Sequence, residues 1–317
     1  MSRRIGRKTG KIKGEITGKI RPVVSIIIPC YNSALTIEKC LVSLLEQETE
    51  IPYEIIVVDS SVDQTPGIIR EKFPKINLIS LGQKTYPGAG RNIGARQAQG
   101  QILAFIDSDC IASKDWLSRG FESIQEGYKL VGGAIENANP QSWVSIADYI
   151  LTFNESIPAS QKRLTTAMPS CNLFCRKETF EELGGFENSI LIGEDTLFCY
   201  KANQKFPLLF NPKCLVYHTN RTKVSKFLQH HYLFGRGSAW LRREIPLPGD
   251  IFVKVPIFSF CLPVVRYWRI SNRLFHDKKN RVNFILSSPW IFMGISSWSC
   301  GFIIESFRSS RRYREMR

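Results

Sequence analysis

Short apolar runs alternate with amphipathic segments along the first third of the chain. Four runs rich in β-branched residues have the length of buried strands, at 23–28, 54–59, 76–81 and 102–107. The segments between them have helical periodicity, at 34–46, 65–73 and 91–99. This alternation predicts an α/β fold in which helices cover both faces of a mostly parallel sheet. Ligands of such sheets bind beyond the carboxyl ends of the strands.

The pattern changes after a fifth apolar run at 129–135. Residues 136–165 show no clear period, and we expect them to be irregular. Patterned segments then resume, at 170–186, 193–202 and 207–218. We therefore predict one domain of catalytic size at 22–243, divided at about residue 135.

Polar and acidic residues gather where the predicted strands end. The first strand leads into "PCYN" (29–32), the second ends at Asp59, and the fourth ends in "ILAFIDSDC" (102–110), which contains Asp107 and Asp109. Two carboxylates on one turn can face a single cation, and Mg²⁺ and Mn²⁺ prefer such oxygen ligands. A solvated Asx-turn is the structural alternative for an isolated D-x-D pair.

A glycine-rich segment, "PGAGRNIGA" (87–95), resembles a dinucleotide-binding loop only superficially. That loop begins directly at the end of the first strand, whereas this segment follows the third predicted strand after several intervening residues. Arg91 is the more informative residue, because a guanidinium at the carboxyl edge of the sheet suits bidentate contact with a phosphate. A solvated arginine at a helix N-terminus explains it equally well.

The net charge of +15 is concentrated in two tails, with +7 in residues 1–21 and +4 in residues 308–317. Basic tails suit nucleic acid or an anionic lipid surface. We do not expect nucleic acid, because no helix-turn-helix, zinc-finger or stacking-aromatic motif is found. The nine cysteines form no C-x-x-C pair, and several lie in apolar runs, which favours reduced thiols in the cytosol. The basic start, with no apolar run directly behind it, does not predict a secretion signal.

Motifs in a fixed order resemble the family 2 glycosyltransferases of the GT-A fold. They lie within about residues 23–242 and read "VSIIIPCYN", "EIIVVDSSVDQT", "GAGRNIGARQAQGQILAFIDSD" and "NLFCRKETFEELGGFENSILIGEDTLFCYKA". The resemblance implies a Rossmann-like, mostly parallel sheet flanked by helices. It also implies that residues at about 22–135 bind a nucleotide sugar and that residues at about 136–243 bind the acceptor.

The resemblance further implies roles for residues on the donor side. Asp59 would contact the base or ribose of the donor, and Arg91 would lie near its phosphates. Pro29 and Tyr31, in the turn after the first strand, would belong to the same site. Asp63 is either a member of the site or a structural residue of its loop.

Metal and acceptor contacts follow from the same resemblance. Asp107 would face the ribose or a divalent cation, and Asp109 would ligate the Mn²⁺ or Mg²⁺ that bridges the diphosphate. His218 would be a third metal or phosphate contact, although a lone histidine after a strand is commonly structural. Asp195 would be the base that deprotonates the acceptor hydroxyl, with Glu194 orienting the acceptor.

The expected activity is metal-dependent, inverting transfer of a sugar from a nucleoside diphosphate sugar to a hydroxyl acceptor, in cell-surface polysaccharide or glycolipid synthesis. The segment 229–244 lacks the Gln-x-x-Arg-Trp signature of processive synthases, so we expect transfer of a single sugar. One alternative is a nucleotide-sugar-binding protein without turnover. Another is a nucleotidyltransferase, but the turn "PCYNSALT" lacks the basic glycine-rich loop that such an enzyme needs.

Residues 244–317 form a separate hydrophobic and basic region, for which we expect a helical appendage. The uncharged run 255–265 is too short to cross a membrane, and the uncharged run 282–304 is long enough. Basic residues on both sides of 282–304 oppose a simple crossing. We expect this region to lie in or on an anionic membrane surface on the cytoplasmic side, where the acceptor would be lipid-linked or another hydroxyl compound. A soluble helical subdomain is the alternative.

Overall fold

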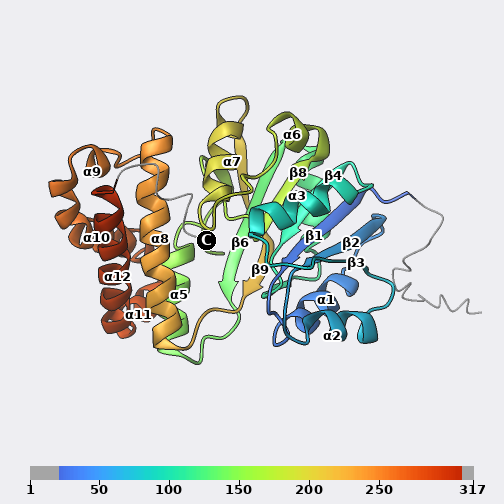
Figure 1. The fold of residues 1–317 in the computed structure, drawn as a ribbon, viewed down its shortest axis with the longest axis horizontal. Coiled ribbons are helices and arrows are strands. Elements are labelled where there is room, and N and C mark those ends of the chain that lie inside the picture. The colour runs from blue at the N-terminus through green and yellow to red at the C-terminus, as the bar shows by residue number, and fades with distance from the viewer. Residues whose placement is uncertain (1–20, 309–317) are drawn as a thin grey trace, which may run out of the picture.

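The computed structural model describes residues 21–308, so the basic tails predicted at 1–21 and 308–317 lie almost wholly outside the described residues. Within this range, a nine-stranded sheet occupies the centre of the molecule (Figure 1). The strand order is β3-β2-β1-β4-β8-β6-β9-β5, and β7 pairs with β9. The strands are β1 (Val24–Cys30), β2 (Tyr53–Asp59), β3 (Asn77–Ser80), β4 (Ile102–Ile106), β5 (Cys110–Ala112), β6 (Leu130–Asn137), β7 (Arg163–Thr165), β8 (Asn172–Arg176) and β9 (Leu208–His218).

The half of the sheet formed by β1 to β4 is parallel, as the alternating pattern predicts. β1 pairs with β2 on one side and with β4 on the other, and β3 pairs with β2. Ile26, Ile27 and Ile28 are all fully buried, because helices cover both faces of the sheet. The predicted order of alternating strands and helices is therefore confirmed, and the carboxyl ends of these strands share one edge.

The helices divide between the two faces of the sheet. On one face the core contains side chains of α1 (Ile37–Leu45), α2 (Thr65–Lys72), α4 (Trp116–Gln125) and α5 (Trp143–Phe153). On the other face it contains side chains of α3 (Pro87–Gln97), α6 (Lys177–Glu182) and α7 (Glu194–Asn203). Each face thus has its own apolar core.

The expectation that residues 136–165 are irregular is wrong, because α5 and the short strand β7 lie there. The side chain of Ser142 accepts a hydrogen bond from the amide of Ser145 and caps the start of α5. Nearly every residue of α5 is buried, against the sheet on one side and the C-terminal helices on the other. Its polar residues Ser145 and Asp148 share one side of the helix, but they are buried and hydrogen-bonded to Asn137 and His231, so this polar side does not face solvent.

The second half of the sheet is mixed, and its register brings β9 to the same edge as β4. β8 runs antiparallel to both β4 and β6, so β4 and β6 point the same way. β9 is parallel to β6. His218, the last residue of β9, therefore lies at the edge where Asp107 follows β4.

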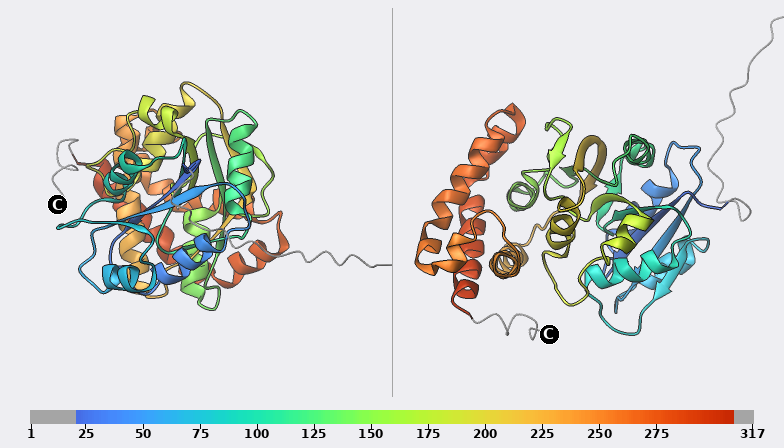
Figure 2. Two further views of the ribbon diagram at one scale, coloured as in Figure 1. Left: turned by 90° about the vertical axis from the view of Figure 1, so that its right-hand side faces the viewer. Right: turned by 90° about the horizontal axis from the view of Figure 1, so that it is seen from above.

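The C-terminal helices form a further layer beside the sheet (Figure 2). They are α8 (Val224–Glu244), α9 (Ile251–Lys254), the 3-10 helix η1 (Pro256–Cys261), α10 (Leu262–Leu274), α11 (Lys278–Leu286) and α12 (Ser288–Ser306). α12 packs closely along α8: a Cβ atom added to Gly235 would lie 1.9 Å from the carbonyl oxygen of Trp298. Buried Glu305 accepts hydrogen bonds from Arg236 and Arg243 of α8.

The expected helical appendage is thus present and packs firmly on the rest of the chain. None of the helices in residues 21–308 is both long enough and apolar enough to cross a membrane.

Candidate active site

A cleft of about 320 Å³ opens at the carboxyl edge of the parallel strands. Its walls come from the turn after β1, the residues after β3, the start of α3 and the turn between β4 and β5. Among the predicted site residues, Pro29, Tyr31, Asp107 and Asp109 line it. Arg221, which follows β9, also lines it. The structure therefore brings two of the three predicted metal ligands, Asp107 and Asp109, into one cavity with the predicted donor residues Pro29 and Tyr31.

The D-x-D turn is held from below by neighbouring polar groups. The amide of Cys110 donates to the carbonyl oxygen of Asp107 at 3.0 Å, which closes the turn. The hydroxyl of Ser108 lies 2.7 Å from that of Ser33, so the middle residue is tied to the loop after β1. Asp107 and Asp109 keep 31% and 39% of their side chains exposed, and both remain accessible from the cleft.

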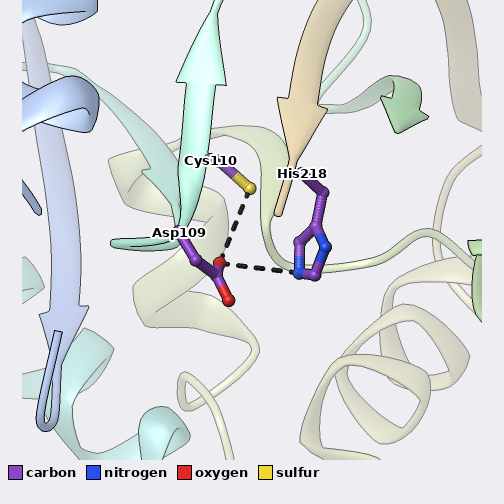
Figure 3. A group of neighbouring side chains, drawn as sticks. All are labelled: Asp109, Cys110 and His218. Atoms are coloured by element: carbon purple, nitrogen blue, oxygen red, sulfur yellow. Dashed lines mark hydrogen bonds and ion pairs between the residues drawn. The ribbon is translucent and has the colours of Figure 1, made fainter. Parts of the chain in front are cut away.

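His218 faces Asp109 across the pair of strands β5 and β9, with Nε2 lying 3.5 Å from Oδ1 (Figure 3). Its Nδ1 lies 3.1 Å from Oδ1 of Asn220, whose amide nitrogen donates to Asn137. Asn220 therefore presents its oxygen, to which Nδ1 donates a hydrogen bond. Nε2, on the other side of the ring, faces a carboxylate oxygen, and a cation between the two atoms would be bound by both. The residues present fit a divalent metal ion.

Cys110 is the third member of this group, with Sγ 4.0 Å from Oδ1 of Asp109. Burial raises the pKa of its thiol well above the usual value, so the sulfur stays protonated. Because the thiolate is the form that binds metals, the effective donors are oxygen and nitrogen. That donor set suits Mn²⁺ or Mg²⁺ better than a soft, thiophilic metal.

Arg91 lies beneath the cleft, with only 1% of its surface exposed. Its Nη2 donates to Asp107 at 2.5 Å, and its Nη1 donates to Glu194 at 2.9 Å. The two carboxylates keep the guanidinium charged and raise its pKa, against the effect of burial. In the structure, Arg91 thus links the D-x-D turn to the predicted acceptor side.

Glu194 and Asp195 begin α7, directly after Gly193. Glu194 is buried, and burial together with the charge of Asp195 raises its pKa to about 7, although Arg91 opposes the shift. Asp195 is half-buried and accepts hydrogen bonds from the amides of Thr196 and Ser170. Burial raises its pKa as well. A carboxylate whose pKa lies above the ordinary range is suited to accept a proton near neutral pH.

The two aspartates after β2 are placed differently from the cleft residues. Asp59 is 2% exposed, and its Oδ1 accepts a hydrogen bond from the hydroxyl of Ser61 at 2.6 Å. Asp63 accepts from the amide and hydroxyl of Thr65 and from the amide of Ala34. These bonds lower the pKa of Asp63 and make it a structural residue that joins the loops after β1 and β2.

Sequence reasoning misses two residues of this region, Arg221 and Asp148. Arg221 lies three residues beyond His218 at the carboxyl end of β9, and this position is a signal that could have identified it. Asp148 lies within α5, in the segment expected to be irregular. It is fully buried and holds Arg221 through two hydrogen bonds.

Comparison with known proteins agrees with the motifs and the fold. The glycosyl transferase family 2 model matches residues 25–184, just over half of the chain. Glycosyltransferase AglE of Haloferax volcanii is 32% identical over 288 residues, which cover 88% of this chain and 92% of that protein. Succinoglycan biosynthesis protein ExoO of Rhizobium meliloti is 36% identical over 102 residues, which cover 32% of this chain and 29% of that protein.

Solved structures of two transferases share the fold. Mannosyltransferase PcManGT of Pyrobaculum calidifontis, in complex with GDP-Man and Mn²⁺, aligns over 91% of this chain and 88% of its own, with a TM-score of 0.58 and 17% identity. TarS of S. aureus, in complex with UDP-GlcNAc, aligns over 92% of this chain and 91% of its own, with a TM-score of 0.52 and 20% identity. The predicted GT-A architecture is confirmed, and the chain is a glycosyltransferase that belongs to glycosyl transferase family 2.

Proposed function

We propose that this enzyme transfers a sugar from a nucleoside diphosphate sugar to a hydroxyl acceptor, with a divalent metal ion and with inversion at the anomeric carbon. The observation that carries the proposal is the buried bridge formed by Arg91. It joins Asp107, at the cleft, to Glu194, beside the candidate base. Structural neighbours that bind GDP-Man with Mn²⁺ or UDP-GlcNAc support the class of donor.

The residues fit a single displacement. Asp195 accepts the proton of the acceptor hydroxyl as that oxygen attacks the anomeric carbon, and Glu194, fixed by Arg91, orients the acceptor. The bond from the anomeric carbon to the diphosphate oxygen breaks on the opposite side, so the configuration inverts. Asp107, Asp109 and His218 would hold a divalent cation, which would stabilise the charge on the leaving diphosphate as a Lewis acid.

Two substitutions in the full chain test the assignment. Asp195→Asn should lower transfer by about 10²–10⁴-fold and leave binding of nucleoside diphosphate with Mn²⁺ nearly unchanged, because only the base is lost. Asp109→Ala should remove the dependence of that binding on Mn²⁺, measured by calorimetry. Asp115→Ala, which changes an aspartate at the start of α4 whose side chain is 48% exposed, is the matched control. If nucleoside diphosphate binding by the Asp109→Ala variant depends on Mn²⁺ as it does in the wild type, Asp109 is not a metal ligand.

We further propose that residues 244–317 hold the enzyme at the cytoplasmic face of a membrane, where the acceptor is lipid-linked or another hydroxyl compound of cell-surface polysaccharide or glycolipid synthesis. The exposed side of α10 supports this proposal. Val264 and Trp268 lie there, and Phe275 follows directly after the helix; these side chains recur at helical spacing and are 75%, 65% and 45% exposed. Arg269 and Lys278 are exposed on the same segment of chain. Apolar stripes with basic neighbours suit an anionic lipid interface.

A further inference from the structure

We propose that Arg221 binds the diphosphate of the sugar donor, and that the buried carboxylate of Asp148 positions Arg221 for this contact. The inference rests on the proposed function and adds a residue pair to its donor site. It starts from the cleft itself: Arg221 lines the same cavity as Asp107 and Asp109, and 36% of its side chain is exposed. A guanidinium at that place can meet an anion that enters the cleft.

Asp148 fixes Arg221 at both its backbone and its side chain. Oδ2 of Asp148 accepts hydrogen bonds from the amide of Arg221 at 3.0 Å and from Nη1 at 3.1 Å. Oδ1 lies 3.0 Å from Nε2 of His231, a fully buried residue of α8. The carboxylate is itself fully buried, and the hydrogen bond from His231 and the charge of Arg221 lower its pKa despite burial, so it stays ionised. The loop after β9 is thus tied to α5 and α8.

This arrangement leaves part of the guanidinium for a ligand. A guanidinium carries five N–H donors in a planar fork, so Asp148 can hold one side while another side contacts phosphate oxygens. Because the side chain is already ordered by Asp148, binding does not have to immobilise a free arginine, which would weaken the affinity. Arg221 is therefore preorganised at the rim of the cleft.

Charge balance also favours Arg221 over Arg91 for the diphosphate contact. Arg91 is buried, and its two terminal nitrogens donate to Asp107 and Glu194. The cleft-lining carboxylates, by contrast, would repel an approaching diphosphate. A cationic group next to them offsets that repulsion. When the bond to the anomeric carbon breaks, its electron pair stays on the diphosphate oxygen, and Arg221 would stabilise that charge.

The test measures binding to the full chain by calorimetry, with UDP and GDP as probes in the presence of Mn²⁺ and with uridine and guanosine as probes that lack phosphate. Arg221→Gln should weaken binding of the nucleoside diphosphate by about 10- to 100-fold, the value of a charge-assisted hydrogen bond, and leave nucleoside binding unchanged. Arg221→Lys should retain part of the affinity, because the charge remains. Arg119→Gln, at an exposed arginine of α4 that pairs with two carboxylates, is the matched control and should bind like the wild type.

Asp148 is tested through its dependence on Arg221. Asp148→Asn should weaken diphosphate binding in the wild-type background and have no further effect in the Arg221→Gln background, because its role acts through Arg221. Equal losses in both backgrounds would show a general structural role and overturn the positioning assignment. If the Arg221→Gln variant binds UDP or GDP as tightly as the wild type does, the proposal is overturned. Failure of the wild type to bind either probe would instead count against the proposed function.

Discussion

At the scale of single residues, Glu194 and Asp195 are adjacent carboxylates, of which the first is buried and the second half-buried. Burial is the first cause that raises the pKa of each, and Glu194 is raised to about 7. Arg91 opposes the shift for both because its positive charge favours the ionised forms. The ionisation of this pair therefore depends on burial and mutual repulsion on one side, and on Arg91 and the hydrogen bond from the amide of Thr196 on the other.

A base acts only when it is deprotonated, and this fixes the sign of the pH dependence. We expect kcat/KM for sugar transfer to fall as the pH falls through the raised pKa of Asp195, and to be constant above it. Binding of nucleoside diphosphate with Mn²⁺, measured at the same pH values, separates this effect from protonation of the metal ligands. A rate that stays constant down to the ordinary pKa of an aspartate, about 3.9, would contradict the assignment of Asp195 as the base.

Some site residues can be predicted from the sequence because their positions depend on local structure. Asp107 and Asp109 directly follow a buried strand, and any parallel sheet would bring them to its carboxyl edge. The partners of Arg91 and Arg221 are different, because Glu194 is 103 residues from Arg91 and Asp148 is 73 residues from Arg221. Such pairs depend on the packing of distant elements, which hydrophobic periodicity does not encode.

At the scale of elements, the start of α7 is supported by α8. Gly193 precedes Glu194 with a φ of 99°, a left-handed conformation that residues other than glycine adopt at a cost of about 1–2 kcal/mol. A Cβ atom there would lie 2.4 Å from Cδ1 of Leu241 in α8. Leu241 is itself packed with Ile190 and Trp240, so it has little room to move. The carboxylate pair therefore sits on a turn held against α8.

We expect Gly193→Ala to lower both the stability of the protein and kcat, because the strained turn and the contact with Leu241 displace Asp195. Gly184→Ala is the matched control. Gly184 also has a positive φ, of 77°, but a Cβ atom there would meet nothing within 4 Å. Chemical denaturation should show a loss of about 1–2 kcal/mol for the control and a larger loss for Gly193→Ala. Equal kcat in the two variants would argue against the support of the base by α8.

The elements themselves could be predicted only where their burial is one-sided or their position in the sheet is regular. The strands β1 to β4 and the helices between them follow the alternating pattern. α5 does not, because it lies between the sheet and the C-terminal helices and buries nearly all its side chains. The polar side of α5, with Ser145 and Asp148, faces hydrogen-bond partners inside the protein, and these partners are in place only in the folded chain.

At the scale of the whole molecule, exposed apolar side chains are concentrated in the C-terminal helices. Sixteen of the 24 exposed large hydrophobic residues in the described part of the chain lie between residues 251 and 307. The remaining eight are scattered over the sheet domain, whose surface is ordinary for a globular protein. This concentration in one region, with basic residues beside it, supports the proposed contact with an anionic bilayer.

Vesicle sedimentation of the full chain tests this proposal without removing helices that pack on the domain. We expect the protein to bind vesicles that contain both phosphatidylcholine and phosphatidylglycerol. Binding to vesicles of phosphatidylcholine alone should be weaker, because they lack the anionic headgroups that attract the basic side chains. The double variant Val264→Glu, Trp268→Glu should reduce binding at least about tenfold, since two apolar side chains no longer leave water. Leu164→Glu, at a 61% exposed position on β7, is the control and should bind like the wild type. Unchanged vesicle binding by the double variant would contradict the proposal. A dimer of the wild type in the absence of lipid, dissociated by the same two substitutions, would also contradict it. In that case a second copy of the chain would cover this surface.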